Sequence, residues 1–389
     1  MNFIKKVIRA LAYRVMLLVG HLAPISNKKI LVSSYYGKGY GDNPKYIVEA
    51  LLKRNQNYKI YWIVIDDGAK STLPDGVKAV KLTSVLLPFH SATAKIWIDN
   101  CRREFMYYKK KGQFYLQTWH GFALKRIEKD VAEHLDQEYV ENAIRDSKAI
   151  DLIVSDSKFM TGVYQNSFWY EGKIAEFGAP RNDELLCTES QKKNRAKIQN
   201  YYHLPREAKI LLYAPTFRAD KSLEPYKIDF KRVMGACKEK FSSDFVVLVR
   251  LHPNICERSS ELDFSWGDLI VDASKFPDMQ VLLSASDVVI SDYSSLMFDF
   301  AISKKPCFQF ATDIEEYKKD RNFYFPLDNL PFSVAKNNEE LLRDISEFNQ
   351  ERYQKALDEF FSRVGMILDG KASEKCAEII EDICFNKEK

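Results

Sequence analysis

The chain has 389 residues, of which 46% are hydrophobic and 29% are charged, and its formal net charge is +4. A single hydrophobic core stops growing at about 250–300 residues, so this length predicts two domains. The composition is typical of a folded globular chain and excludes a disordered or low-complexity protein.

The positive charge is confined to the N-terminus. Residues 1–22 contain Lys5, Lys6, Arg9 and Arg14 and no acidic residue. Taking these 4 from the 58 basic residues leaves 54 against 54 acidic residues in the rest of the chain. A nucleic-acid-binding protein usually has a basic excess in its body, so this class is disfavoured.

The cysteines and acidic residues do not indicate a metal site. The 7 cysteines stand singly, without a CxxC pair, which disfavours both a zinc site and a disulfide framework. Asp66 and Asp67 follow an expected strand and are interpreted as a turn. Magnesium is left open as an assisting ion, and no metal ligand is assigned.

Residues 1–27 are expected to form an amphipathic helix that associates with a membrane. A basic helix with one apolar face can lie in an anionic membrane surface, and the alternative is a helix packed on its own domain. The uncharged run 15–27 is too short to span a bilayer and contains His21 and Pro24. The apolar residues that helical spacing puts on one face are Ile4, Val7, Ile8, Leu11, Val15, Leu18, Val19 and Leu22.

Strand-like and helix-like segments alternate through residues 28–180, which are expected to form an N-terminal domain. This rhythm predicts a parallel sheet covered by helices, as in Rossmann-like folds. A helix is expected at 43–54. The expected strands are 29–35, 59–65, 79–82, 95–99, 114–118, 149–155 and 173–177.

The alternation restarts after the turn-rich segment 178–183. Residues 181–365 are therefore expected to form a second Rossmann-like domain, with 366–389 as a C-terminal helix. Two such domains would face a cleft that holds a ligand at the ends of their strands. The expected helices are 184–202, 230–241 and 279–285, and the expected strands are 208–214, 245–251, 269–272, 288–291 and 306–310.

The segment Val288–Ala301 predicts a strand, a polar turn and a helix. A helix start exposes unpaired amide groups, and with the hydroxyls of Ser294 and Ser295 it suits a phosphate. An ordinary helix cap is the alternative. Asp292 and Asp299 either contact a ribose, orient a histidine or are structural.

Polar residues also follow three other expected strands. His120 ends one of them, Thr216 and Arg218 follow the second, and Arg250 and His252 follow the third. Each has a structural alternative as a turn or an ion pair. Together the four strand ends indicate a two-domain transferase that acts on a phosphate-containing donor.

An ordered set of motifs resembles the CDP-glycerol glycerophosphotransferase family, which makes teichoic acid and related polyol-phosphate polymers. The resemblance runs from Lys28 to the C-terminus. It implies a GT-B-type fold in which the C-terminal half mainly holds the donor and the N-terminal domain, residues 28–180, binds the acceptor. Phe122 and Ala123 stand where family members often have Thr-Pro. The motifs are QTWHG at 117–121, GAPRND at 178–183, YAPTFR at 213–218, RLHP at 250–253, SDYSSLMFDF at 291–300, KKP at 304–306 and DGKAS at 369–373.

The resemblance implies transfer of glycerol phosphate from CDP-glycerol to a hydroxyl of a lipid-linked saccharide or a growing polyol-phosphate chain, with release of CMP. His120 is expected to be the general base, since imidazole titrates near neutral pH. His252 would stabilise charge on the phosphates. The expected donor-binding residues are Pro215, Thr216, Arg218, Arg250, Asp292, Ser294, Ser295 and Asp299, and those near the acceptor are Gly121, Lys125, Arg181 and Asp183.

The expected partners are CDP-glycerol, a polyprenyl-pyrophosphate-linked saccharide and an anionic membrane surface, with no nucleic acid. The N-terminal helix would then hold the enzyme at the cytoplasmic face of the cell membrane. The alternatives are a CDP-ribitol ribitolphosphotransferase, a GT-B glycosyltransferase that uses a CMP- or UDP-sugar, and a non-catalytic scaffold.

Overall fold

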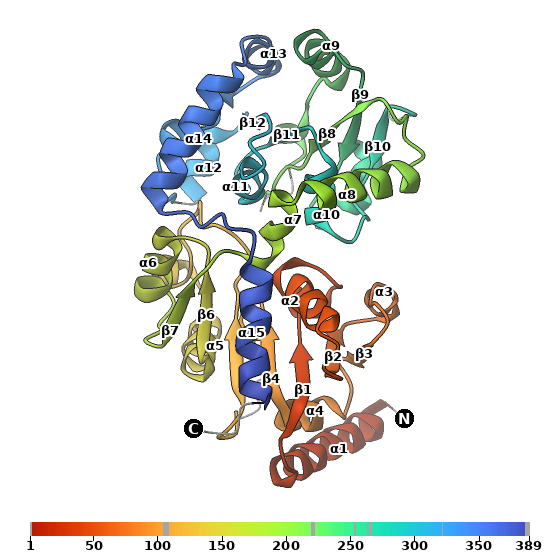
Figure 1. The fold of residues 1–389 in the computed structure, drawn as a ribbon, viewed down its shortest axis with the longest axis vertical. Coiled ribbons are helices and arrows are strands. Elements are labelled where there is room, and N and C mark those ends of the chain that lie inside the picture. The colour runs from red at the N-terminus through yellow and green to blue at the C-terminus, as the bar shows by residue number, and fades with distance from the viewer. Residues whose placement is uncertain are drawn as a thin grey trace. The chain divides into compact units, whose positions relative to one another are not determined.

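The computed structural model describes the chain except residues 1, 104–108, 219–221, 253, 263, 265, 266, 321 and 386–389. The chain forms two compact units. Unit 1 comprises Met1–His120, Glu128–Asp183 and Asp369–Lys389, and unit 2 comprises Gly121–Ile127 and Glu184–Leu368. Each unit has a parallel sheet with helices around it (Figure 1).

The sheet of unit 1 has 7 strands in the order β3-β2-β1-β4-β5-β6-β7. All of its paired strands run parallel. The strands are β1 (Ser26–Val32), β2 (Lys59–Val64), β3 (Val77–Lys81), β4 (Ala94–Asp99), β5 (Phe114–Gln117), β6 (Leu152–Ser155) and β7 (Lys173–Glu176). The helices are α1 (Asn2–Leu22), α2 (Asp42–Lys53), α3 (Asp67–Ser71), α4 (Leu87–Thr93), α5 (Gln137–Ala149), α6 (Lys158–Ser167) and α15 (Ala372–Phe385).

The sheet of unit 2 has 6 strands in the order β10-β9-β8-β11-β12-β13, again with parallel pairs. The strands are β8 (Lys209–Tyr213), β9 (Phe245–Val249), β10 (Ile270–Asp272), β11 (Val288–Ser291), β12 (Cys307–Phe310) and β13 (Val334–Ala335). The helices are α7 (Asp183–Leu186), α8 (Thr188–Tyr201), α9 (Phe230–Phe241), α10 (Met279–Ala285), α11 (Leu296–Ala301), α12 (Ile314–Asp320), α13 (Asn338–Ser346) and α14 (Gln350–Val364).

Both sheets have the strand order of a doubly wound Rossmann fold, as the alternating pattern predicted. In such a sheet the order of the strands reverses at a switch point, and ligands bind at the carboxyl ends of the strands there. The switch point lies between β1 and β4 in unit 1 and between β8 and β11 in unit 2. In the four strands beside these points, the segments 30–32, 96–98, 210–213 and 288–290 are apolar and buried.

Three expected elements differ most from the structure. The expected strand 29–35 is β1 at Ser26–Val32, and Tyr35 begins a short 3-10 helix instead. The expected strand 149–155 begins only at Leu152, because Ala149 is the last residue of α5. The expected helix 184–202 is interrupted at Cys187, whose backbone is extended (φ −100°, ψ 109°), and so forms α7 and α8.

Helix α15 belongs to unit 1 although it follows unit 2 in the sequence. It packs against α2 and β1, and Cys376 and Ile380 share a hydrophobic cluster with Ile30. On the rim of this contact, Arg54 forms ion pairs with Glu374 and Glu381.

Helix α1 lies beside α4 (Figure 1). The two helices pack closely at Gly20, because a Cβ atom added there would lie 2.9 Å from the Cα of Phe89 in α4. Lys110 donates to the carbonyl of Ala23 just beyond the helix, at 2.6 Å. Within the described part of the chain, no helix combines the length and the apolar character that crossing a membrane requires.

The outer face of α1 carries apolar side chains that the unit leaves in solvent. Leu11 and Leu18 are 63% and 62% exposed. The side chain of Ile4 lies outside the described residues, and the other members of this face that are exposed are Val7, Ile8, Val15, Val19 and Leu22.

Candidate functional site

His120 lies beside the switch point of unit 1. It follows β5, the strand next to β4, and its Nδ1 atom lies 2.6 Å from the carbonyl oxygen of Asn100 at the end of β4. The side-chain oxygen of Asn100 accepts a hydrogen bond of 2.9 Å from the amide of Tyr35, just after β1. The ends of β1, β4 and β5 therefore meet at His120, where ligands of such sheets bind.

The hydrogen bond to Asn100 determines which ring nitrogen of His120 can act as a base. A carbonyl oxygen only accepts, so Nδ1 carries the hydrogen and Nε2 keeps its lone pair. Burial lowers the pKa of His120 below its usual value, although the bond to Asn100 opposes this shift. The imidazole is therefore neutral at neutral pH and able to accept a proton at Nε2.

The backbone around His120 is strained. A non-glycine residue with positive φ is uncommon, and such residues concentrate at functional sites. Several occur close to His120 in unit 1, each with φ between 44° and 59°: Tyr35, Tyr36, Asp42, Trp119 and Glu128. This concentration supports a functional role for the His120 turn.

Arg181, an expected acceptor residue, is connected to the same turn through Asn43. The side chain of Asn43 donates to the carbonyl of Trp119 at 3.1 Å and accepts from the amide of Arg181 at 3.0 Å. Asp183 has a different environment, because its carboxylate accepts from the amides of Ala372 and Ser373 at the start of α15. Its contacts are those of a helix cap.

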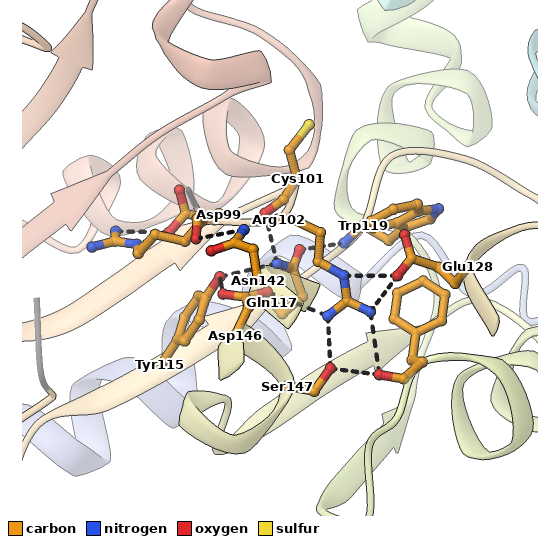
Figure 2. A network of polar contacts seen from close by, with 12 residues as sticks. Asp99, Cys101, Arg102, Tyr115, Gln117, Trp119, Glu128, Asn142, Asp146 and Ser147 are labelled. Atoms are coloured by element: carbon orange, nitrogen blue, oxygen red, sulfur yellow. Dashed lines mark hydrogen bonds and ion pairs between the residues drawn. The ribbon is translucent and has the colours of Figure 1, made fainter. Parts of the chain in front are cut away.

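A buried ionic network underlies the His120 turn (Figure 2). The guanidinium of Arg102 lies 2.7 Å from Glu128 and 3.3 Å from Asp146, and all three side chains are at most 2% exposed. The hydroxyl of Tyr115 donates to Asp146 at 3.0 Å. The sequence analysis did not select these residues, since no single motif relates Arg102 to carboxylates 26 and 44 residues away.

The switch point of unit 2 is closed by a hydrogen bond between its two central loops. The hydroxyl of Thr216, after β8, donates to Asp292, after β11, at 3.0 Å, and the amide of Thr216 donates to the same carboxylate. Pro215 is buried beside it. Asp292 therefore holds the loop that carries Thr216.

Arg218 makes contacts within the unit in several directions. Its guanidinium lies 2.8 Å from Asp292 and 2.5 Å from Asp313, and it also donates to the carbonyl of Thr216. Only 6% of Arg218 is exposed. Arg218 thus supports the loops that follow β8 and β11.

His252 and Arg250 follow β9. His252 is exposed, and its Nδ1 atom accepts a hydrogen bond of 3.2 Å from the amide of Asn254. This nitrogen is therefore unprotonated in the neutral ring, and Nε2 carries the hydrogen. Arg250 donates to the carbonyl of Phe276, and Pro253 lies outside the described residues.

Ser294 and Ser295 precede α11, which has 6 residues. Such a short helix has a weak dipole, so their hydroxyls and amides are the relevant groups. Ser295 makes no side-chain cap bond. Its hydroxyl lies close to Gly121, where an added Cβ would be only 2.7 Å away, so a side chain at 121 would displace that hydroxyl.

The remaining expected residues have contacts within unit 2. The carboxylate of Asp299 accepts a hydrogen bond of 3.3 Å from the side-chain nitrogen of Gln280. The ammonium of Lys125 lies over the ring of Tyr317, 4.9 Å from its centre. In the described ranges, no group of three or more His, Cys, Asp or Glu side chains is arranged to hold a metal ion.

Residues 15–382 match the family model for CDP-glycerol:poly(glycerophosphate) glycerophosphotransferases. The chain belongs to this family. It is 32% identical over 374 residues to a teichoic acid poly(glycerol phosphate) polymerase of Staphylococcus epidermidis, a match that covers 92% of this chain and 51% of that protein. The chain therefore spans about half the length of this relative.

A second relative has nearly the same length as this chain. The chain is 30% identical over 392 residues to a teichoic acid glycerol-phosphate transferase of Staphylococcus aureus, which covers 97% of this chain and 99% of that protein. The fold is also similar to a solved structure of the wall teichoic acid polymerase TagF, in a form with one histidine replaced by asparagine and soaked with CDPG. The TM-score is 0.85 at 29% identity, covering 98% of this chain and 96% of that chain.

Proposed function

We propose that this protein transfers glycerol phosphate from CDP-glycerol to a hydroxyl of a lipid-linked saccharide or of a growing polyol-phosphate chain in teichoic acid synthesis. Family membership supports the donor and the reaction class. The observation that carries the mechanism is the opposite hydrogen bonding of two histidines, His120 in unit 1 and His252 in unit 2.

His120 is the general base of the proposed reaction. Its Nδ1–H donates to Asn100, which leaves Nε2 to take the proton of the acceptor hydroxyl. The oxygen then attacks the phosphorus that bears glycerol, and the bond from this phosphorus to the CMP oxygen breaks. A new phosphodiester forms and CMP leaves with the electron pair of the broken bond.

His252 binds the phosphates of the donor as a hydrogen-bond donor. Its Nδ1 atom accepts from Asn254, so the Nε2–H group points its hydrogen to a ligand oxygen. Arg250 adds positive charge beside it. Groups of this kind stabilise the charge that develops on the phosphates during transfer.

The other donor contacts come from the switch point of unit 2. Ser294 and Ser295 bind the pyrophosphate through hydroxyls and amides, and Thr216 contacts the nucleotide end. Arg218 and Asp292 act by holding Thr216 in place, as their mutual contacts indicate. Pro215 and Asp299 shape the same loops.

Asn100 contributes a group to the acceptor side. Its side-chain Nδ2 atom is buried and has no hydrogen-bond partner within the described ranges. A buried unpaired donor costs free energy unless a water or a ligand pairs with it. We propose the acceptor for this role. Gly121, Lys125 and Arg181 are proposed as further residues near the acceptor, with Asp183 as support.

The apolar outer face of α1 is proposed to bind the anionic cytoplasmic surface of the membrane, which carries the lipid-linked acceptor. Exposed Lys5 and Lys6 at the start of the helix match the charge of that surface. The inner face of α1 is already packed beside α4. The outer face is therefore available for the membrane.

The test is release of CMP by the purified protein with CDP-glycerol and a lipid-linked disaccharide. Release is expected only when the acceptor is present, and His120→Ala should abolish most of it while CDP-glycerol still binds. CDP-ribitol is tested in parallel. Faster release from CDP-ribitol would overturn the glycerol donor, and binding without release from either donor and several acceptors would indicate a scaffold.

A further inference from the structure

The side chain of Gln117 is buried three residues before His120 and uses its full hydrogen-bonding capacity. Its oxygen accepts from the amides of Thr118 and Trp119 at 3.0 and 2.9 Å. Its nitrogen donates to the carbonyl of Cys101 at 2.9 Å and to the hydroxyl of Tyr115 at 3.1 Å. A primary amide offers two donors and two acceptor positions, and all four are used here.

These bonds hold both ends of the contact that defines the His120 tautomer. Trp119 directly precedes His120, and Cys101 directly follows Asn100, whose carbonyl accepts from Nδ1 of His120. One side chain thus fixes the chain beside the ring and the chain beside its acceptor. Movement of either segment would lengthen the Nδ1–H bond to Asn100.

Gln117 also stabilises a strained residue. Trp119 has φ 51°, a value that a bulky residue rarely adopts. The indole packs on the imidazole of His120 with ring centres 4.2 Å apart and meets the ring of Phe168 edge-on. The bond from the Trp119 amide to Gln117 therefore maintains the ring packing that orients His120.

The other side of Gln117 is anchored in the buried ionic network (Figure 2). Tyr115, which accepts from Gln117, donates to Asp146, and Asp146 pairs with Arg102. Figure 2 shows Gln117 between this network and the turn that carries Trp119. A packed network of this kind moves little, so it provides a rigid support for the turn.

We infer that Gln117 is a positioning residue for His120, which fixes the tautomer and the orientation of the imidazole through the Thr118–Trp119 turn and the Asn100–Cys101 turn. The catalytic consequence rests on the proposed function. The effect on the imidazole does not, because it is a property of the protein without substrate.

The chain contains a matched control. Gln113 precedes the same strand, β5, and is also buried. Its amide nitrogen donates to the carbonyls of Ser91 and Ala94, and its oxygen accepts from the amide of Lys110. None of these groups lies in the turns that hold His120, so replacing Gln113 tests the general cost of removing a buried glutamine.

The experiment compares Gln117→Met with Gln113→Met in the full-length protein. Histidine labelled with ¹⁵N reports the tautomer of each ring, and His120→Gln identifies the His120 signal among the 6 histidines. The wild type and Gln113→Met should show His120 protonated at Nδ1. Gln117→Met should show a mixture of tautomers, and kcat should fall about 10- to 100-fold with the KM for CDP-glycerol within about twofold.

A retained Nδ1–H signal in Gln117→Met would overturn the inference whatever the activity. Unchanged kcat with an altered tautomer would instead count against His120 as the base and leave the positioning role intact. Gln117→Glu serves if Gln117→Met does not fold, because a glutamate keeps an oxygen for the two amides. It should retain more of the Nδ1–H signal than Gln117→Met, and an equal loss would overturn the inference.

Discussion

The two units place a histidine beside the same kind of switch point but surround it differently. His120 in unit 1 is half-buried, packs on Trp119 and donates through Nδ1. His252 in unit 2 is exposed and accepts at Nδ1. The difference matches the two proposed tasks, because a base needs a lone pair in a fixed, poorly solvated place, whereas a group that binds phosphate needs an accessible N–H group.

The supports beneath the two sites are nevertheless alike. Each unit has one buried arginine between two carboxylates, Arg102 with Glu128 and Asp146 in unit 1 and Arg218 with Asp292 and Asp313 in unit 2. In both, the network lies beneath the loops that carry the site residues. Rigid support is thus common to both units, and the exposure of the histidine is what differs.

The largest effect is expected from replacing the two histidines one at a time. His120→Gln should lower kcat by about 10²–10⁴ because the general base is lost, with little change in CDP-glycerol affinity. His252→Gln removes a donor to the phosphates and should weaken CDP-glycerol binding as well as turnover. Steady-state kinetics and calorimetric titration of the donor separate the two, and the same pattern for both variants would refute the assigned division.

Removing either buried arginine should destabilise its own unit. Arg102→Met leaves the buried carboxylates of Glu128 and Asp146 without their cationic partner. Arg218→Met does the same to the buried Asp292 and to the partly exposed Asp313. Breaking such a group typically costs about 3–5 kcal/mol in the free energy of unfolding. Hydrogen exchange should show faster exchange mainly in unit 1 for Arg102→Met and in unit 2 for Arg218→Met. Arg232→Met, at an exposed ion pair with Glu339, is the control and should change little.

The acid limb of the rate profile should lie below the usual pKa of histidine. His120 must be neutral to accept a proton, and burial lowers its pKa. The value of kcat/KM should therefore persist as the pH falls past 6.5 and then drop about tenfold per pH unit. Burial raises the pKa of Asp99 to about 6, so Asp99→Asn is measured alongside. An acid limb at or above pH 6.5 in both proteins would contradict His120 as a base with a lowered pKa.

The smallest effect on turnover is expected from changes on the outer face of α1. The double change Leu11→Ser and Leu18→Ser should weaken binding to vesicles of anionic phospholipid by about tenfold per leucine, given about 1.5–3 kcal/mol for a fully buried leucine. Turnover of a short soluble acceptor should not change. Leu269→Ser removes a leucine of unit 2 that is 47% exposed and should leave vesicle binding intact. Equal loss in both proteins would count against α1 as the membrane face.

The sequence was informative about the fold wherever strands are buried on both faces. The run 288–290 contains only residues that favour a strand. Helices α9 and α10 begin and end at the expected residues. The two-residue strand β13 was not predicted, because so short a segment has no periodicity. The sequence also did not predict that Gly121–Ile127 belongs to unit 2, since this depends on contacts with residues distant in sequence.

The site was predictable only to the level of which residues follow strands. The positions of His120 and Thr216 follow from the strand pattern, because the carboxyl ends of parallel strands meet at one edge. The tautomers could not be predicted, as they depend on the carbonyl of Asn100 and the amide of Asn254. The ion pairs of Arg218 could not be predicted for the same reason, since its carboxylate partners lie 74 and 95 positions further along the chain.

The place of α15 in unit 1 has a consequence for synthesis. Its residues Cys376 and Ile380 complete the hydrophobic cluster around Ile30, yet they are translated after all of unit 2. Domains are generally expected to fold in the order in which they leave the ribosome. Here the unit whose strands are made first must wait for the last helix, so unit 2 can close its core while unit 1 is still incomplete. A nascent chain released early would therefore carry a finished unit 2, the proposed donor-binding unit, and an unfinished unit 1, which holds the proposed base.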